Sequence, residues 1–148
     1  MLGDKTMEHT ITVAATPEQL FSFFEETLLK DIKEHKGLEL DPKKLSNGFT
    51  FNMDLGSPGY KKKVEITLIE YRKPYVYYTK TKTPSNTYLT RYTFTPNEKG
   101  TEVKYMETVY DEYGKDVTPF GLLAVSSNRN SFKRKIKGIS KLVIRKSN

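Results

Sequence analysis

A single carboxylate stands among the apolar positions of a predicted β-hairpin at residues 92 to 110, YTFTPNEKGTEVKYMETVY. Glu107 follows the same alternation as Val103, Tyr105 and Val109, and alternate residues of a strand share one face. A carboxylate in an apolar interior is desolvated, which raises its pKa and suits it to orient a ligand hydroxyl or amine, or to act as an acid or base. A rim position, or pairing with a tyrosine, a lysine or solvent, would also explain Glu107.

Hydrophobic patterning selects one register for this hairpin. A one-residue slip would bury Arg91 and Lys104, so we place the turn within residues 97 to 101. The expected inner pairs are Phe94 with Val103, Tyr92 with Tyr105, Thr90 with Glu107, and Tyr88 with Val109. The expected outer pairs are Thr95 with Glu102, Thr93 with Lys104, and Arg91 with Met106.

The residue types do not indicate cysteine chemistry, a metal site, or a nucleophile or phosphate-binding motif. The chain has no Cys, so it has no disulfide, thiolate zinc site or cysteine nucleophile. Neither His9 nor His35 has a partner at ligand spacing, and the sequence contains no GxSxG, GxGxxG or GxxxxGK[ST] motif. We therefore expect no catalytic set, no metal site and no cofactor.

The first elements of the chain are a strand and a helix. Residues 8 to 14 alternate as a strand does. Thr16, Pro17 and Gln19 have the spacing of an N-cap, a first helical residue and a capping box. The apolar stripe that follows predicts a helix with one buried face, ending near Gly37. This stripe contains Leu20, Phe21, Phe24, Leu28 and Ile32.

Strand periodicity returns at residue 48. Asp41 before Pro42 indicates a short helical turn in the preceding connection. In the next strand Phe49, Phe51 and Met53 share one side. Two further strands are expected at residues 60 to 71 and 75 to 83, and the facing of the second is ambiguous because bulky residues fall on both sides.

A long amphipathic helix is predicted to close the chain, starting at Thr118 and Pro119. Its apolar arc contains Val125, Phe132, Ile136, Ile139 and Val143, with Asn128 at its border. Beside the arc runs a basic stripe of Arg129, Lys133, Lys137, Lys141 and Arg145. Residues 117 to 148 contain eight Lys or Arg and no acid, so they carry all the excess of the +7 net charge.

Size and hydropathy describe a single domain. A chain of 148 residues can bury a sizeable core, or a core with a cavity. We expect one domain over residues 1 to 148. No apolar run approaches the roughly 20 residues of a membrane span, so we expect a cytoplasmic protein without a transmembrane segment.

The order of these elements resembles the helix-grip superfamily, which includes the START and birch-pollen-allergen-like (SRPBCC) domains. The resemblance covers nearly the whole chain and is carried by ITVAATPEQLFSFFEE, IEYRKPYVYY, the hairpin at residues 92 to 110 and the closing helix. It is closest to small bacterial members of unknown function. It implies an α+β fold in which a curved antiparallel sheet of about six to seven strands wraps around the C-terminal helix. It also implies a cavity for an apolar small molecule between the sheet and that helix.

We predict that the chain binds an apolar or amphipathic small molecule, lipid-like or polyketide-like, in that cavity. The expected lining is Phe49, Phe51, Met53, Tyr92, Tyr105, Glu107, Asn128 and Phe132. One alternative is docking on a protein or anionic surface through Arg129, Lys133, Lys137 and Lys141, without specific nucleic-acid binding. The other is a cyclase, dehydratase or hydrolase that uses Glu107 with a tyrosine. The lack of a catalytic motif favours a protein that is not an enzyme.

Overall fold

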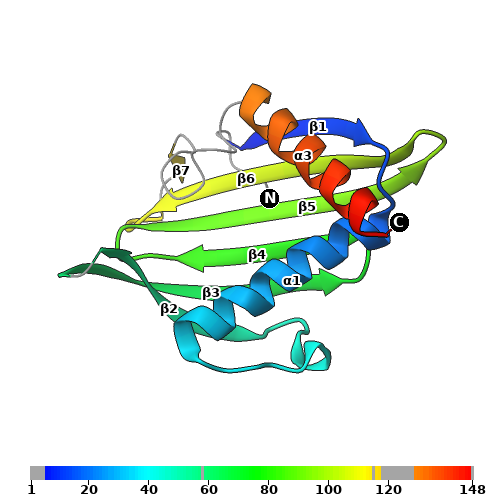
Figure 1. Ribbon diagram of the computed structural model, residues 1–148. Helices are drawn as coiled ribbons and strands as arrows, with labels where there is room; N and C mark the ends of the chain where they lie inside the picture. The colour runs from blue at the N-terminus through cyan, green and yellow to red at the C-terminus, as the bar shows by residue number, and fades with distance from the viewer. Residues whose placement is uncertain (1–5, 58, 115, 118–128, 148) are drawn as a thin grey trace.

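In the computed structural model of the chain, a curved antiparallel sheet carries the two long helices of the described residues on one face (Figure 1). The structure describes residues 6–57, 59–114, 116–117 and 129–147. The strands are β1 (Met7–Val13), β2 (Thr50–Ser57), β3 (Tyr60–Arg72), β4 (Val76–Lys82), β5 (Asn86–Asn97), β6 (Gly100–Asp111) and β7 (Asp116–Val117). The helices are α1 (Pro17–Lys36), the short 3₁₀ helix η1 (Pro42–Lys44) and α3 (Arg129–Ser147).

The strand order is β1-β6-β5-β4-β3-β2, and β7 also pairs with β6. This is the α+β architecture expected from the sequence. The helices converge where the start of α1 meets the later part of α3, and they diverge towards the other end of the sheet (Figure 1). No helix in the described ranges is long and apolar enough to cross a membrane.

Helix α1 begins and ends as its sequence predicts. The Gln19 amide N–H donates to Thr16 Oγ1 at 3.1 Å, and the Thr16 amide N–H donates to Gln19 Oε1 at 2.9 Å. This reciprocal capping box satisfies two amide groups at the helix start. At the other end Gly37 adopts a φ of 64° and donates to Lys33 O at 2.8 Å. Asp41 is the N-cap of η1, as Thr16 is of α1, because its side chain accepts a hydrogen bond from the Lys43 amide N–H at 3.0 Å.

The β5–β6 hairpin has the predicted register. Tyr92 lies opposite Tyr105 and Thr90 lies opposite Glu107, and the outer-face pairs also match. Its turn brings Gly100, at a φ of 132°, against the end of β1. A Cβ atom at this position would lie 2.1 Å from the Val13 carbonyl oxygen. Only glycine fits there.

Three segments meet beside this turn in a buried joint. Thr101 Oγ1 donates to the Ala15 carbonyl oxygen at 2.6 Å. The Ala15 amide N–H in turn donates to Ser140 Oγ at 3.1 Å. The hairpin, the segment between β1 and α1, and the middle of α3 are therefore held together through the backbone of one residue.

The inner face of the sheet packs in two clusters. The first lies between α3, the first half of α1 and strands β1, β5 and β6; it contains Val13, Ala15, Leu20, Phe21, Phe24, Tyr92, Phe94, Val103, Tyr105, Phe132, Ile136, Ile139 and Val143. The second lies under the second half of α1 and contains Leu28, Ile32, Leu45, Phe51 and Leu68. Tyr71 and Tyr77 pack against both clusters.

The facing of β4, which the sequence leaves ambiguous, is fixed by this packing. Tyr77 lies opposite Tyr92 and points inward, whereas Tyr78 lies opposite Arg91. The Arg91 guanidinium lies 5.7 Å from the centre of the Tyr78 ring. Tyr78 therefore takes part in the outer face, and its bulk is covered by a cation rather than by the core.

The predicted closing helix is present as α3 from Arg129 onward. Phe132, Ile136, Ile139 and Val143 are buried, as their arc predicts. The start predicted at Thr118 and Pro119, and the predicted arc member Val125, lie outside the described residues.

Candidate functional site

Glu107 is fully buried on the inner face of β6, with an exposed fraction of 0%. Its neighbours across the sheet are Thr90 on β5 and Met7 on β1. The Tyr105 hydroxyl donates to Glu107 Oε2, while Oε1 has no hydrogen-bond partner among the described residues. Burial raises the pKa of Glu107, and the hydrogen bond from Tyr105 offsets only part of that shift. Glu107 therefore keeps its proton to a higher pH than an exposed glutamate does, and a proton on Oε1 would be available to a water or a ligand.

Two more buried polar atoms lie in the same part of the sheet. Thr90 Oγ1, directly across from Glu107, has no partner in the described part of the chain, and the same holds for His9 Nε2. His9 lies opposite Tyr105 and stacks on its ring, with 6.4 Å between ring centres. Phe132 lies 5.5 Å from the His9 ring on the α3 side. Buried polar atoms are nearly always hydrogen-bonded, so three of them on adjacent strands indicate a place for water or a ligand.

An amine from α3 borders this group. Lys135 Nζ donates to the Tyr92 hydroxyl at 3.4 Å and lies 5.9 Å from the centre of the Tyr92 ring. The Tyr92 ring lies 5.0 Å from that of Tyr105, whose hydroxyl binds Glu107. Burial lowers the pKa of Lys135 because the charged amine is poorly solvated there. We name His9, Thr90, Tyr92, Tyr105, Glu107 and Lys135 the inner polar group.

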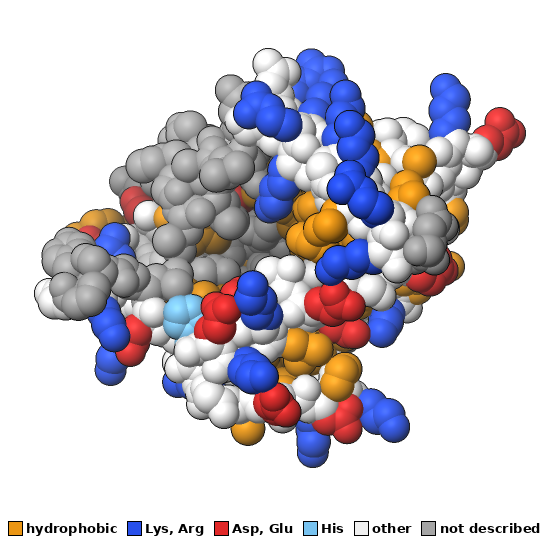
Figure 2. All heavy atoms as spheres, in the orientation of Figure 1, with side chains coloured by type: hydrophobic (Ala, Val, Ile, Leu, Met, Phe, Trp, Pro, Cys, Tyr) orange, Lys and Arg blue, Asp and Glu red, His pale blue; other side chains and the backbone are white. Residues whose placement is uncertain are grey.

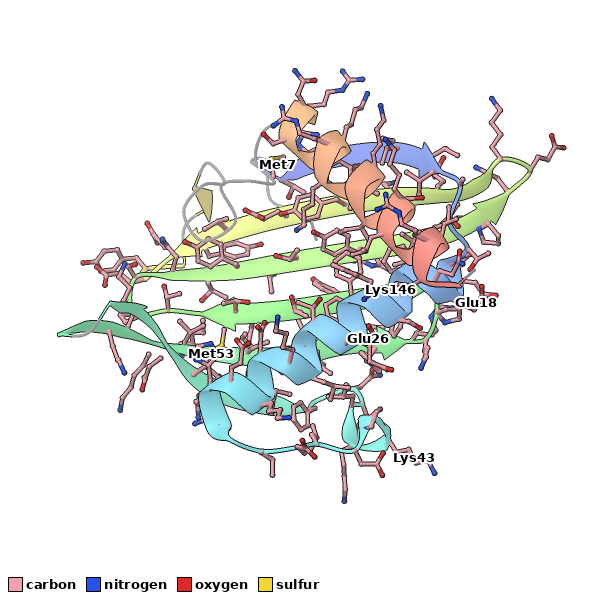
Figure 3. All side chains as sticks on the ribbon, viewed as in Figure 1. Met7, Glu18, Glu26, Lys43, Met53 and Lys146 are labelled. Carbon is pink, nitrogen blue, oxygen red and sulfur yellow. The ribbon has the colours of Figure 1, made fainter. Side chains whose placement is uncertain are left out.

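The structure places the predicted lining residues in two places. Tyr92, Tyr105, Glu107 and Phe132 lie together in or beside the first cluster. Three others, Phe49, Phe51 and Met53, lie in or against the second cluster under α1. Figure 3 shows this separation, with Met53 beside the end of α1 and Met7, the neighbour of Glu107, beside the start of α3. Asn128 lies outside the described residues. A single cavity lined by all of them stays a prediction.

Sequence reasoning passed over Thr90 and Lys135 as functional residues. Lys135 is one of many basic residues near the C-terminus, and the basic stripe beside it is the more conspicuous pattern. The signal was its spacing, because it follows Phe132 by three residues and precedes Ile139 by four. Residues so spaced share a helix face. Thr90 is paired with Glu107 in the predicted register, but a threonine gives no sign in sequence that its hydroxyl lacks a partner.

A second buried acid shows what a satisfied carboxylate looks like here. Glu25 on α1 accepts a hydrogen bond from the Tyr71 hydroxyl and another from Lys73 Nζ at 3.2 Å. Its desolvation is met by two donors, one of them charged. Burial and the bond to Glu25 together raise the pKa of Tyr71, so its proton stays in place. Glu25 therefore has a structural role, in contrast to the open oxygen of Glu107.

Side chains for metal binding do not gather in the part of the chain that is described. Within those residues no group of three or more His, Asp or Glu side chains could hold an ion. The inner polar group brings one histidine and one carboxylate to neighbouring strands, which is fewer protein ligands than zinc sites use. Its chemistry is that of hydrogen bonding and proton donation.

Cations line the exposed side of α3 (Figure 2). No ion pair found among the described residues includes a basic residue of α3, although such pairs occur on α1, β1, β3, β5 and β6. The predicted basic stripe is exposed at Arg129, Lys137, Lys141 and Arg145, and half-buried at Lys133. This side of the helix is therefore a concentrated positive surface.

Comparisons with known proteins give a family and a fold. The family model described as a domain of unknown function, DUF3284, matches residues 7–116. A search of curated proteins found no match. Among solved structures, protein CV1439 from Chromobacterium violaceum is 14% identical with a TM-score of 0.59, over 94% of this chain and 97% of that one.

Two further structures have the same architecture. Ara h 8.0201 is 14% identical with a TM-score of 0.58, over 93% of both chains. The di-domain ARO/CYC StfQ from the steffimycin biosynthetic pathway is 15% identical with a TM-score of 0.54, over 95% of this chain and 48% of that one. At such identities the likeness establishes the helix-grip fold alone. Since the family model covers well over half of its length, the chain belongs to the DUF3284 family, and its fold is the helix-grip fold.

Proposed function

We propose that the protein binds an apolar or amphipathic small molecule between the sheet and α3, with its polar end at Glu107. The observation that carries this proposal is the buried Oε1 of Glu107, which has no partner among the described residues. A buried polar group left unpaired costs about 1 to 3 kcal/mol. A ligand or water that forms a hydrogen bond with Oε1 removes that cost.

The surroundings of Glu107 define what such a molecule must offer. Tyr105, Tyr92 and Phe132 supply aromatic surface, with ring centres 5.0 to 5.4 Å apart. Thr90 and Glu107 face each other across β5 and β6, so their Cβ atoms are about 5 Å apart. One acceptor atom on a ligand can therefore meet both hydroxyl-type donors while its apolar part contacts the rings.

Binding of a neutral fluorescent apolar probe tests the proposal. We expect Nile red to bind saturably, with displacement by 1-dodecanol, and expect Glu107→Met, which removes the hydrogen-bonding group, to weaken the binding of dodecanol. Glu102→Met is the matched control, because Glu102 is exposed on the opposite face of the same strand. Equal loss of binding in both variants, or no saturable binding in the wild-type protein, would reject the proposal. Organic extraction of the purified protein followed by mass spectrometry would identify a natural ligand.

The unpaired cations of α3 favour a second candidate function, docking on an anionic surface. A helix with basic residues and no acid attracts anionic lipid with about 1 kcal/mol per basic residue near the surface. We expect binding to vesicles of 30% phosphatidylglycerol that disappears in high salt and on charge reversal of Lys137 and Lys141 together. Binding unchanged by both treatments would reject this candidate.

A further inference from the structure

Lys135 differs from the other cations of α3 in its surroundings. Its amine lies against the ring and hydroxyl of Tyr92, at the edge of the first cluster, whereas Lys137 and Lys141 are exposed. No carboxylate among the described residues forms an ion pair with it. A partly buried amine beside a phenol and without an anion is costly to keep charged, which agrees with the lowered pKa of Lys135.

The acid nearest in the network does not balance this amine. Glu107 reaches Lys135 only through two aromatic neighbours, Tyr105 and Tyr92. Burial also favours the uncharged form of Glu107, since its pKa is raised. The inner polar group therefore has an amine at one end and a carboxyl group at the other. Each can donate a hydrogen bond when it is protonated, and the amine has no carboxylate counter-ion within the described residues.

We propose that the site prefers a long-chain carboxylate, whose head group is the counter-ion that Lys135 lacks. This inference rests on the proposed function and names the class of its ligand. The charge favours a monoanion, because one ammonium group balances one carboxylate and would leave a phosphate dianion half compensated. A carboxylate oxygen can also accept a hydrogen bond from protonated Glu107, which belongs to the same inner polar group.

The energetics of the pairing set the size of the preference. A hydrogen bond to a charged group contributes more than one between neutral groups, and its loss corresponds to a change in affinity of roughly tenfold to hundredfold. A bound carboxylate also raises the pKa of Lys135, because a nearby anion favours the charged form of the amine, and this strengthens the binding of the carboxylate further. A neutral alcohol of the same chain length gains neither effect.

Displacement of Nile red by dodecanoate below its critical micelle concentration, and by 1-dodecanol below its solubility limit, at pH 7.4 tests the inference. We expect dodecanoate to bind at least tenfold more tightly than dodecanol to the wild-type protein. Lys135→Met should weaken dodecanoate roughly tenfold to hundredfold and change dodecanol less than about threefold. Lys135→Arg should restore most of the preference. Lys137→Met, on the exposed side of the same helix, should leave both affinities unchanged.

The outcomes distinguish failure of the carboxylate preference from failure of the proposed function. Equal affinity of the wild-type protein for dodecanoate and dodecanol overturns the carboxylate preference and leaves the proposed function standing. Absence of binding by either compound rejects the proposed function itself. An equal effect of Lys137→Met shows that dodecanoate binds to the outer cations and also overturns the inference. If Lys135→Met does not fold, the thermal shift produced by the two compounds in the wild-type protein decides, since only dodecanoate should raise Tm strongly.

Discussion

Gly100 is the position where a single methyl group should disturb the fold most directly. In Gly100→Ala the new Cβ would lie 2.1 Å from the Val13 carbonyl oxygen and 2.8 Å from Ala14 Cα. Both atoms belong to the backbone, so no side chain can turn away to make room. The hairpin and the end of β1 must separate by about 1 Å for ordinary contact, and β1 carries the register that sets His9 against Tyr105.

The expected cost has two separable parts. A non-glycine residue at this positive φ costs about 1 to 3 kcal/mol through backbone strain. The clash adds about 1 to 3 kcal/mol for overpacking and a similar amount if the buried bond from Thr101 to Ala15 breaks. Gly48→Ala isolates the first part, because Gly48 has a φ of 90° and nothing lies within 4 Å of the place that its new methyl group would take.

Urea denaturation of both variants measures the difference. We expect Gly100→Ala to lose about 2 to 6 kcal/mol more than Gly48→Ala. For a chain of 148 residues, 1 kcal/mol corresponds to about 3 °C in Tm, so the difference is about 6 to 18 °C. A loss of stability within about 0.5 kcal/mol of the Gly48→Ala value would show that β1 does not lie against the turn in this way.

Three other substitutions test the buried contacts. Thr101→Val should cost about 1 to 3 kcal/mol, since it leaves the Ala15 carbonyl oxygen without its partner; a urea midpoint equal to that of the wild-type protein would contradict this. Phe132→Ala, at a fully buried ring, should cost about 3 to 5 kcal/mol in the same assay, and a cost below about 1 kcal/mol would mean that the ring is not packed. Glu107→Gln should gain stability relative to the wild-type protein as pH rises. The pKa of Glu107 in the folded protein lies above its ordinary value of 4.5. Above about pH 4.5 the native wild-type protein therefore binds more protons than the unfolded chain does, and it loses stability as the pH rises. A difference in unfolding free energy between the two proteins that is constant from pH 4 to 9 would refute the burial of a titrating acid.

The fold followed from the sequence where one strong pattern decided the answer. The hairpin register was predictable because only one pairing keeps Arg91 and Lys104 out of the core, and the start of α1 because the capping box has one reading. Patterns of this kind act over neighbouring residues. They show that a face is buried, but not against what.

The site was predictable only in part for that reason. Glu107 stood out because its charge broke an apolar alternation. Phe51 met the same periodic criterion as Tyr105, yet α1 covers it together with Leu68, so it belongs to a different cluster. Lys135 is set apart from other lysines by the ring of Tyr92 beneath it, which comes from a strand more than forty residues away in sequence. Contacts between distant segments were the missing information.

The joint at Ala15 holds α3 at Ser140, so the start of the described helix lies far from the point where the helix is held. Ser140 binds the Ala15 amide N–H, and Arg129, where the described helix begins, lies eleven residues, or about 16 Å, away along the axis. A tilt of only about 10° about that fixed point displaces the far end of the helix by about 3 Å, the width of one water molecule, without breaking the bond to Ala15. Small changes in the angle of α3 about Ser140 thus become larger changes in the space above His9 and Glu107.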